Sequence, residues 1–348
     1  MSAPAPSMYS PAAQEVASRL GLKMGRPNLE EFADTLLALA KVNRDVLAVT
    51  SDSRGSGKLG PFAAALPDQI VELGIAEQNL VGVAAGLASC GKVVFAVSPA
   101  CFLTARALEQ IKNDVAYSDN PVNLIGISAG VSYGALGSTH HSLHDLAALR
   151  AINNIDIVVP ADNFETHQII QLAARRQKPT YIRFGKAPLY NLPRVNLSNP
   201  PIADLKFEIG GFDRLTAGKS IQVRDGSDVC FIATGETVIH ALLAAESLRE
   251  KGLSCRVISM HTIKPLDVDA VLRAGGECGA IVTVEEHSIH GGLGEACASV
   301  LMQAGTRVRM KIVGLPDEYT VTGSQADIFR HYGITMEGLA ETALSVVK

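Results

Sequence analysis

The sequence predicts an α/β protein with two doubly wound domains, each built on a mainly parallel β-sheet with helices on both faces. Two observations lead to this prediction. Short apolar runs alternate along the chain with stretches in which apolar residues recur at helical spacing, a pattern typical of such sheets. The chain has 348 residues, of which 47% are hydrophobic. This length and composition suffice for two separate cores.

The individual elements follow from this alternation. The first part of the chain carries strand-like runs at 46–50, 70–73, 93–97, 122–127, 155–159 and 181–184. Residues 187–227 are rich in Pro, Asn and Gly, which predicts a linker that leads into a short hairpin. A second alternating set has strand-like runs at 229–233, 255–259, 280–284 and 308–313. The expected divisions are 1–25 as an N-terminal extension, 26–190 as the first domain, 191–227 as linker and hairpin, and 228–348 as the second domain.

Composition excludes several classes of function. A formal net charge of −4 and a pI near 6.1 give no bias toward nucleic acid or anionic membranes. The longest apolar runs are far shorter than the roughly 20 residues that span a bilayer. The first residues lack a basic start followed by an apolar block, so no export signal is expected. We therefore expect a cytoplasmic protein that binds neither nucleic acid nor membrane.

Six cysteines are scattered along the chain without a Cys-x-x-Cys pair. Buried, reduced thiols are the favoured interpretation over disulfides or metal ligands. Cys101 lies near the candidate site described below, so sensitivity to oxidation is considered for this residue.

Glu77 is the most informative residue. It follows the apolar run 70–73, and Leu80, Val83, Ala84 and Leu87 then recur at helical spacing. Its side chain is therefore expected near the carboxyl edge of the sheet, where open α/β sheets bind ligands. The alternative is that Glu77 only complements the positive end of a helix.

Five segments of the chain resemble the pyrimidine-binding and C-terminal domains of transketolases and related thiamine-diphosphate enzymes. They are ELGIAEQNLVGVAAGLASCGK (72–92), GSTHHSLHD (137–145), IVVPADNFE (157–165), YIRFGK (181–186) and VEEHSIHGGLGEA (284–296). Their order and spacing match the family over residues 28–346. The sequence lacks a Gly-Asp-Gly followed by Asn, the family signature that holds magnesium and the cofactor diphosphate. The chain thus resembles the C-terminal half of a transketolase, encoded separately.

The resemblance implies an activity and a partner. A transketolase moves a two-carbon ketol unit from a ketose phosphate to an aldose phosphate with thiamine diphosphate. Here Mg²⁺ and the diphosphate would be held by a separate N-terminal subunit, and self-association would give an α2β2 complex. Two alternatives stay open. One is a β-subunit of a 2-oxo acid dehydrogenase or a relative of deoxyxylulose-phosphate synthase. The other is a non-catalytic regulatory subunit.

The resemblance also implies roles at the cofactor. Glu77 would hydrogen-bond the aminopyrimidine of the cofactor and activate it. Phe102 and Ile75 would contact the cofactor, with Phe102 walling the pyrimidine, and His140 would assist proton transfers. A metal site formed by His140 and His144, which are four residues apart, is the disfavoured alternative because no third ligand accompanies them. No metal site is expected in this chain.

Further residues match positions that contact substrate or subunit in the family. Arg183 and Ser56 correspond to groups that bind a sugar phosphate, and Asp52 corresponds to a subunit contact. Ser128 and Leu136 occupy positions where single-chain transketolases carry a histidine and an acidic residue that bind sugar hydroxyls. These two replacements predict an altered sugar specificity. The stretch GGLG (291–294) is expected to form a tight strand-to-helix turn and not a phosphate site.

Overall fold

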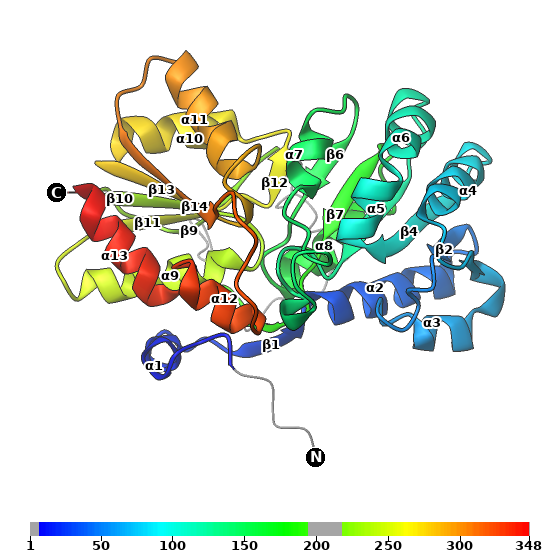
Figure 1. The fold of residues 1–348 in the computed structure, drawn as a ribbon, viewed down its shortest axis with the longest axis horizontal. Coiled ribbons are helices and arrows are strands. Elements are labelled where there is room, and N and C mark those ends of the chain that lie inside the picture. Colours follow the sequence, from blue (N-terminus) through cyan, green and yellow to red (C-terminus); the bar gives the residue numbers. More distant parts are fainter. Residues whose placement is uncertain (1–6, 194–217, 348) are drawn as a thin grey trace.

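The computed structural model describes residues 7–193 and 218–347 as two α/β lobes that lie side by side (Figure 1). The chain up to the linker forms α1 (Pro11–Arg19), β1 (Met24–Pro27), α2 (Asn28–Val42), β2 (Val46–Thr50), α3 (Gly60–Ala65), β3 (Ile70–Glu72), α4 (Glu77–Ser89), β4 (Val93–Pro99), α5 (Ala100–Arg106), α6 (Leu108–Gln110), β5 (Asn123–Ile127), α7 (Asp145–Arg150), β6 (Asp156–Val158), α8 (Asn163–Ala173), β7 (Thr180–Arg183) and β8 (Pro188–Tyr190). Short 3₁₀ turns at Pro67–Gln69 and Gly134–Leu136 and a π-helical segment at Ile111–Tyr117 complete this part.

The first sheet has seven strands in the order β12-β6-β7-β5-β4-β2-β3, and all of its pairings are parallel except that of β12 with β6. Successive side chains of each strand point to opposite faces. Phe95 and Val97 therefore pack toward α2 and α8, whereas Val94 and Ala96 pack toward α4 and the π-helical segment. The carboxyl ends of the six parallel strands meet at one edge.

The second sheet has five strands in the order β14-β13-β10-β11-β9. After the linker the chain forms β9 (Ile221–Arg224), β10 (Val229–Ala233), α9 (Thr237–Arg249), β11 (Cys255–Ser259), β12 (Thr262–Lys264), α10 (Val268–Glu277), β13 (Ala280–Ser288), α11 (Leu293–Gln303), β14 (Arg309–Leu315), α12 (Gln325–His331) and α13 (Met336–Val347). Helices α9 and α13 pack on one face and α10 and α11 on the other. The predicted fold class, two α/β domains with mainly parallel sheets, is confirmed.

The two lobes are joined by shared structure. Strand β12 comes from the second half of the chain but pairs with β6 of the first sheet. One buried apolar cluster runs from α4 and β4 in the first lobe to β10 and α11 in the second. Helix α1 packs on α9, so the expected N-terminal extension is anchored to the second lobe. A shared buried core of this kind fixes the lobes relative to one another.

The hairpin predicted after the linker is not found in the described part of that region. Strand β9 pairs antiparallel with β11 at the edge of the second sheet. It therefore pairs with a strand that is distant in the sequence and not with a neighbour across a tight turn. Strand β8 pairs antiparallel with β1, which lies far upstream. Residues 194–217 of the predicted linker lie outside the described residues.

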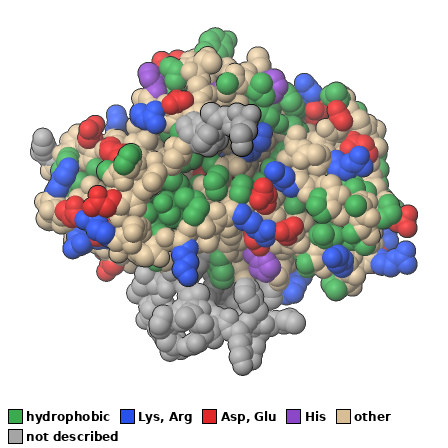
Figure 2. Space-filling view, turned by 90° about the horizontal axis from the view of Figure 1, so that it is seen from below, with side chains coloured by type: hydrophobic (Ala, Val, Ile, Leu, Met, Phe, Trp, Pro, Cys, Tyr) green, Lys and Arg blue, Asp and Glu red, His purple; other side chains and the backbone are tan. Residues whose placement is uncertain are grey.

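The surface carries basic and acidic side chains interspersed on the face seen in Figure 2. None of the helices in the described residues is long and apolar enough to cross a membrane. All six cysteines are free thiols, and five of them are buried. Burial raises the pKa of Cys101 to about 11, so its thiol is not activated as a nucleophile.

Candidate active site

Five loops gather at the carboxyl edge of the first sheet. They follow β2, β3, β4, β5 and β7, which are all parallel, so their side chains converge on one side of the lobe. The loops and the helix starts that follow them carry, in chain order, Asp52 and Ser56, Glu77, Phe102, Leu136 and His140, and the residues after Arg183. The segments chosen from the sequence therefore lie at one edge of the first sheet.

Glu77 is the first residue of α4. The helix forms there because Leu80, Ala84 and Ala88 bury one stripe against the sheet, and it ends where Gly91 adopts a φ of 81°. The Glu77 side chain is 5% exposed, and its Oε1 accepts a hydrogen bond of 2.8 Å from Arg106 Nη1. Among the described residues, no other side chain or backbone group is hydrogen bonded to this carboxylate. Its second oxygen is thus available to a ligand.

Arg106 connects Glu77 to an aromatic cluster. Its guanidinium lies 4.2 Å from the centre of the Phe102 ring. The Phe102 ring meets the His140 imidazole edge-on at 5.3 Å, and the Tyr133 ring also meets it edge-on, at 5.4 Å. These distances are those of favourable aromatic and cation–π contacts.

The cluster ends at Lys186, whose ammonium lies 4.3 Å from the centre of the Tyr133 ring. A continuous contact chain therefore runs along the edge through Glu77, Arg106, Phe102, His140, Tyr133 and Lys186. Lys186 and Tyr133 also line a hollow of about 410 Å³. Partial burial and then the charge of Lys58 lower the pKa of Lys186. A neighbouring anion would relieve that unfavourable charge.

Arg183, the cation chosen from the sequence, is engaged elsewhere. Its side chain is 4% exposed, and Nη1 donates to Asp145 Oδ1 at 2.7 Å while Nη2 donates to the carbonyl of Glu286 at 2.7 Å. Asp145 is fully buried and also accepts from the Tyr181 hydroxyl at 2.6 Å. Burial by itself would raise the pKa of Asp145, but the charge of Arg183 holds it below its usual range. The geometry assigns Arg183 to the joint between the lobes.

The loop after β2 is shaped by Glu72, which the sequence did not single out. Its carboxylate accepts from the Thr50 hydroxyl at 2.7 Å and from the backbone N–H groups of Asp52 at 2.6 Å and Gly74 at 3.0 Å. Burial opposes the ionised form, but these hydrogen bonds lower the pKa of Glu72 overall. Asp52 and Ser56 are exposed on this loop, where a partner or ligand can reach them.

Positive φ angles at non-glycine residues concentrate at the same edge. Of the five such residues in the described chain, Asp52, Lys58 and Ser128 lie in loops of this site, with φ of 51°, 60° and 54°. This conformation costs energy for a residue with a Cβ, and such residues cluster at functional sites. Three of the five such residues of the described chain thus lie at this one edge of the first sheet.

The remaining predicted residues differ in accessibility. Ile75 and Leu136 are exposed large apolar residues, at 73% and 56%, whereas Ser128 is completely buried at the end of β5. The Leu136 side chain is therefore accessible to a ligand or partner, whereas Ser128 is enclosed within the fold. His144 turns its Nε2 toward Thr104 at 3.4 Å, away from the aromatic contacts of His140.

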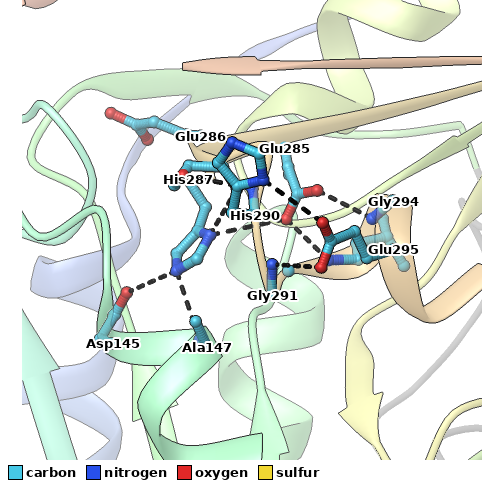
Figure 3. A network of polar contacts seen from close by, with 12 residues as sticks. Asp145, Ala147, Glu285, Glu286, His287, His290, Gly291, Gly294 and Glu295 are labelled. Atoms are coloured by element: carbon cyan, nitrogen blue, oxygen red, sulfur yellow. Dashed lines mark hydrogen bonds and ion pairs between the residues drawn. The ribbon is translucent and has the colours of Figure 1, made fainter. Parts of the chain in front are cut away.

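The GGLG stretch forms the predicted strand-to-helix turn, between β13 and α11. Three of its four backbone N–H groups donate to carboxylates, because Glu285 accepts from Leu293 at 2.7 Å and from Gly294 at 2.8 Å, and Glu295 accepts from Gly291 at 2.8 Å. Figure 3 shows this turn beside His287, which approaches Asp145 of α7. The network joins the two lobes, and the carboxylates of Glu285 and Glu295 accept the hydrogen bonds of the turn.

Sequence reasoning missed Arg106, Tyr133 and Lys186. Arg106 lies one helical turn after Phe102, so an i, i+4 pairing was available as a signal. Lys186 was within the YIRFGK segment, but the sequence alone did not show which of its two cations is buried. Tyr133 carried no signal beyond its place in the loop before His140.

The residues present fit the pyrimidine end of thiamine diphosphate. An aminopyrimidine needs a carboxylate at its ring nitrogen and apolar groups at its faces. Glu77 offers one free carboxylate oxygen, and the half-buried Phe102 and the exposed Ile75 offer apolar surface. Within residues 7–193 and 218–347 there is no cluster of three or more His, Cys, Asp or Glu side chains that could hold a metal ion.

Comparisons with known proteins agree with this arrangement. Residues 28–191 match the family described as transketolase, pyrimidine binding domain, and residues 218–339 match transketolase, C-terminal domain. The chain is 48% identical over 319 residues to one of the subunits of the apulose-4-phosphate transketolase of Phocaeicola vulgatus, covering 92% of this chain and 97% of that protein. It is 31% identical to the 6-deoxy-6-sulfo-D-fructose transketolase subunit SqwH of a Clostridium species, covering 92% and 94%.

A solved structure described as a split gene transketolase, inactive beta4 tetramer, superposes with a TM-score of 0.76 at 32% identity. The match covers 93% of this chain and 98% of that chain, so both lobes and their relative placement are shared. The chain therefore belongs to the transketolase family, as the subunit of a split transferase that carries the pyrimidine-binding and C-terminal domains.

Proposed function

We propose that this chain supplies the pyrimidine half of a thiamine-diphosphate site. A separate N-terminal subunit would hold Mg²⁺ and the diphosphate. Together the two chains would move a two-carbon ketol unit from a ketose phosphate to an aldose phosphate. The observation that supports this most strongly is the contact chain from Glu77 to Lys186. It places a carboxylate, an aromatic ring, an imidazole and a cation next to one another along one edge of the sheet.

Glu77, Phe102 and His140 of this contact chain, together with Ile75, have roles in the proposed reaction. When bound, thiamine diphosphate supplies a nucleophilic thiazolium carbon and an electron sink for the two-carbon fragment. Glu77 hydrogen-bonds the pyrimidine ring nitrogen with the carboxylate oxygen that Arg106 leaves free. Phe102 and Ile75 exclude water from the ring faces. His140 bonds Thr139 through Nδ1 at 3.0 Å, so its Nε2 is left to exchange protons with reacting oxygens.

Substrate recognition is proposed to differ from that of single-chain transketolases. Lys186, together with Ser56, would bind the anionic tail in place of Arg183, because its ammonium is exposed and lines the hollow. Leu136 cannot hydrogen-bond a sugar hydroxyl, and an unpaired buried hydroxyl costs on the order of 1–3 kcal/mol. A branched or deoxygenated sugar avoids this cost. Apulose 4-phosphate, a branched ketose phosphate, is the proposed substrate, because the name of the 48% identical relative contains this compound.

The assembly is proposed to be α2β2, with Asp52 at a subunit contact. The exposed apolar residues Ile75 and Leu136 lie at the edge that the partner would cover. A related chain that assembles without its partner is described as inactive, which supports an obligatory second subunit.

A reconstitution experiment tests the function. The purified chain, a partner chain carrying Gly-Asp-Gly and Asn, and their mixture are assayed with thiamine diphosphate and Mg²⁺. Ribose 5-phosphate is the acceptor for the sugar donors, and glyceraldehyde 3-phosphate is the acceptor for pyruvate. Donors are xylulose 5-phosphate, apulose 4-phosphate and pyruvate. We expect ketol transfer by the mixture only, with a higher kcat/KM for the branched donor. Carbon dioxide release from pyruvate would identify a deoxyxylulose-phosphate-synthase type of reaction instead. A preference for xylulose 5-phosphate would contradict the role given to Leu136.

A further inference from the structure

The second lobe has no side chain in the contact chain from Glu77 to Lys186 among the described residues, yet it touches the loop that carries His140. This loop, residues 130–142, is called the His140 loop below. Its base is closed by a hydrogen bond of 2.8 Å from the Ser142 N–H to the Gly130 carbonyl. His140 and Leu136 both lie on it, so its conformation sets two of the proposed substrate-facing groups.

Four contacts from the second lobe hold the His140 loop. Glu286 of β13 accepts from the Val131 N–H at 2.8 Å. The segment before α12 packs so closely on Gly134 that a Cβ there would meet the Gly323 carbonyl oxygen at 3.0 Å. The third contact joins Thr320 Oγ1 to His141 Nδ1 at 2.8 Å. A fourth, longer contact of 3.4 Å joins Thr320 Oγ1 to Ser138 Oγ. Of these four contacts, only the third involves the residue adjacent to His140.

The contact between Thr320 and His141 has a definite direction. His141 is 4% exposed, and its Nε2 lies 2.9 Å from the carbonyl oxygen of Gly134. A carbonyl only accepts, so Nε2 carries the proton. Burial lowers the pKa of His141, so the ring is neutral and Nδ1 is an acceptor. The Thr320 hydroxyl must therefore donate to Nδ1, and His141 relays the bond across the loop to Gly134.

We propose that Thr320 of the second lobe is a positioning residue for the active site, which fixes His141 and through it the imidazole of His140. The proposal rests on the function proposed above. His140 has little other anchorage, since its ring is placed by edge contacts with Phe102 and Tyr133 and by one bond to Thr139. Displacement of the loop would move this imidazole relative to the reacting oxygens. The second lobe thereby acquires a part in catalysis without contacting substrate.

The chain offers a matched set of variants. Thr320→Val removes the hydroxyl at nearly constant size, and Thr320→Ser restores it. Thr322→Val makes the same change two residues away at an exposed position that has no side-chain hydrogen bond among the described residues. Thr320→Ala replaces Thr320→Val if the valine variant unfolds.

The first measurement is independent of activity. In two-bond ¹H–¹⁵N spectra of the histidine-labelled chain, His141 should give the Nε2–H tautomer pattern. Thr320→Val should shift the signals of His141 and His140 while the other seven of the nine histidines stay in place. Thr320→Ser and Thr322→Val should leave all nine unchanged. Unchanged His140 signals in Thr320→Val would overturn the proposal, whatever the reaction of the complex.

The second measurement uses the assembled two-chain enzyme. Thr320→Val should lower kcat by about 10-fold or more, because small displacements of a positioned group are costly, with KM changed less. Thr320→Ser should recover most of the rate, and Thr322→Val should match the wild type. Equal effects of the two valine variants would overturn the proposal. If the wild-type complex transfers no ketol unit, the proposed function fails, and the spectra still decide whether Thr320 orders the loop.

Discussion

Replacing Arg183 and Lys186 separately by methionine distinguishes a structural cation from a substrate-binding one. The two residues lie three positions apart in YIRFGK, but their surroundings differ. The Arg183 guanidinium is 4% exposed and pairs with Asp145, which is 0% exposed. Lys186 is exposed, and its ammonium faces the Tyr133 ring at 4.3 Å. The same substitution should therefore have opposite consequences at the two positions.

The magnitudes follow from burial. Removing one partner of a buried ion pair leaves the other charge unpaired and costs about 3–5 kcal/mol. Arg183→Met should thus shift the folding equilibrium by about 150- to 4,000-fold. The exposed cation–π contact of Lys186 contributes only about 0.5–1 kcal/mol to stability. Its hydrogen bond to a bound anion, in contrast, is worth about 1.5–3 kcal/mol, so Lys186→Met should lower kcat/KM for a phosphorylated donor by roughly 10- to 100-fold.

Stability is measured by urea unfolding followed by circular dichroism, because the chain contains no tryptophan. Substrate recognition is measured as kcat/KM of the assembled enzyme for phosphorylated and dephosphorylated donors. Arg183→Met should unfold at lower urea concentration, with the ratio of kcat/KM between phosphorylated and dephosphorylated donors unchanged. Lys186→Met should keep nearly the wild-type urea midpoint but lower that ratio. An Arg183→Met chain with wild-type stability and a lost preference for phosphate would refute the reasoning and restore Arg183 as the anion ligand.

Three further predictions concern single carboxylates and the exposed leucine. Glu77→Gln should reduce turnover of the complex by about 10²-fold or more while leaving the urea midpoint nearly unchanged, since it removes a positioned acid–base group; turnover near the wild-type rate would contradict this. Burial, and then the charge of Glu286, raise the pKa of Glu236 from 4.5 to about 8. The folded chain therefore favours the protonated carboxyl group. The stability that this contributes is complete below the pKa of the unfolded chain and is lost as the pH rises through about 8. Glu236→Gln does not titrate and should therefore lose less stability than the wild type when urea unfolding is compared at pH about 6.5 and about 8.5; equal losses would refute the assignment. Leu136→Asp should raise kcat/KM for xylulose 5-phosphate relative to a branched donor, and an unchanged ratio would show that Leu136 does not face the sugar.

The strands and the start of α4 could be predicted because they depend on local patterns. Each parallel strand is buried on both faces, so its residues form a continuous apolar run that stands out between helical stretches. Glu77 was found in the same way, from the change of period at the end of the run 70–73. The predicted fold class and family are confirmed, whereas the roles of the individual site residues stay predictions.

What could not be predicted depends on contacts between distant segments. Arg183 is buried at the joint between the lobes because it donates to Asp145 and to the carbonyl of Glu286, which is 103 positions away in the sequence. The pairing of Arg106 with Glu77 spans 29 positions. Strand β12 joins the first sheet although it lies after the linker, and β9 joins an edge of the second sheet. Local sequence does not encode which edge or which buried carboxylate is nearby, so these features require the structure.

The central claim is that this chain holds one half of a thiamine-diphosphate site and that Glu77 activates the cofactor only when a partner completes it. Exchange of the thiazolium C2 proton for deuterium, followed by NMR after acid quenching, measures that activation without any sugar substrate. With Mg²⁺ present, we predict exchange at the rate of free cofactor for the chain alone and for its partner alone, and much faster exchange for their mixture. The mixture containing Glu77→Gln should return to the slow rate. Fast exchange by the isolated chain, or by the Glu77→Gln mixture, would contradict the account.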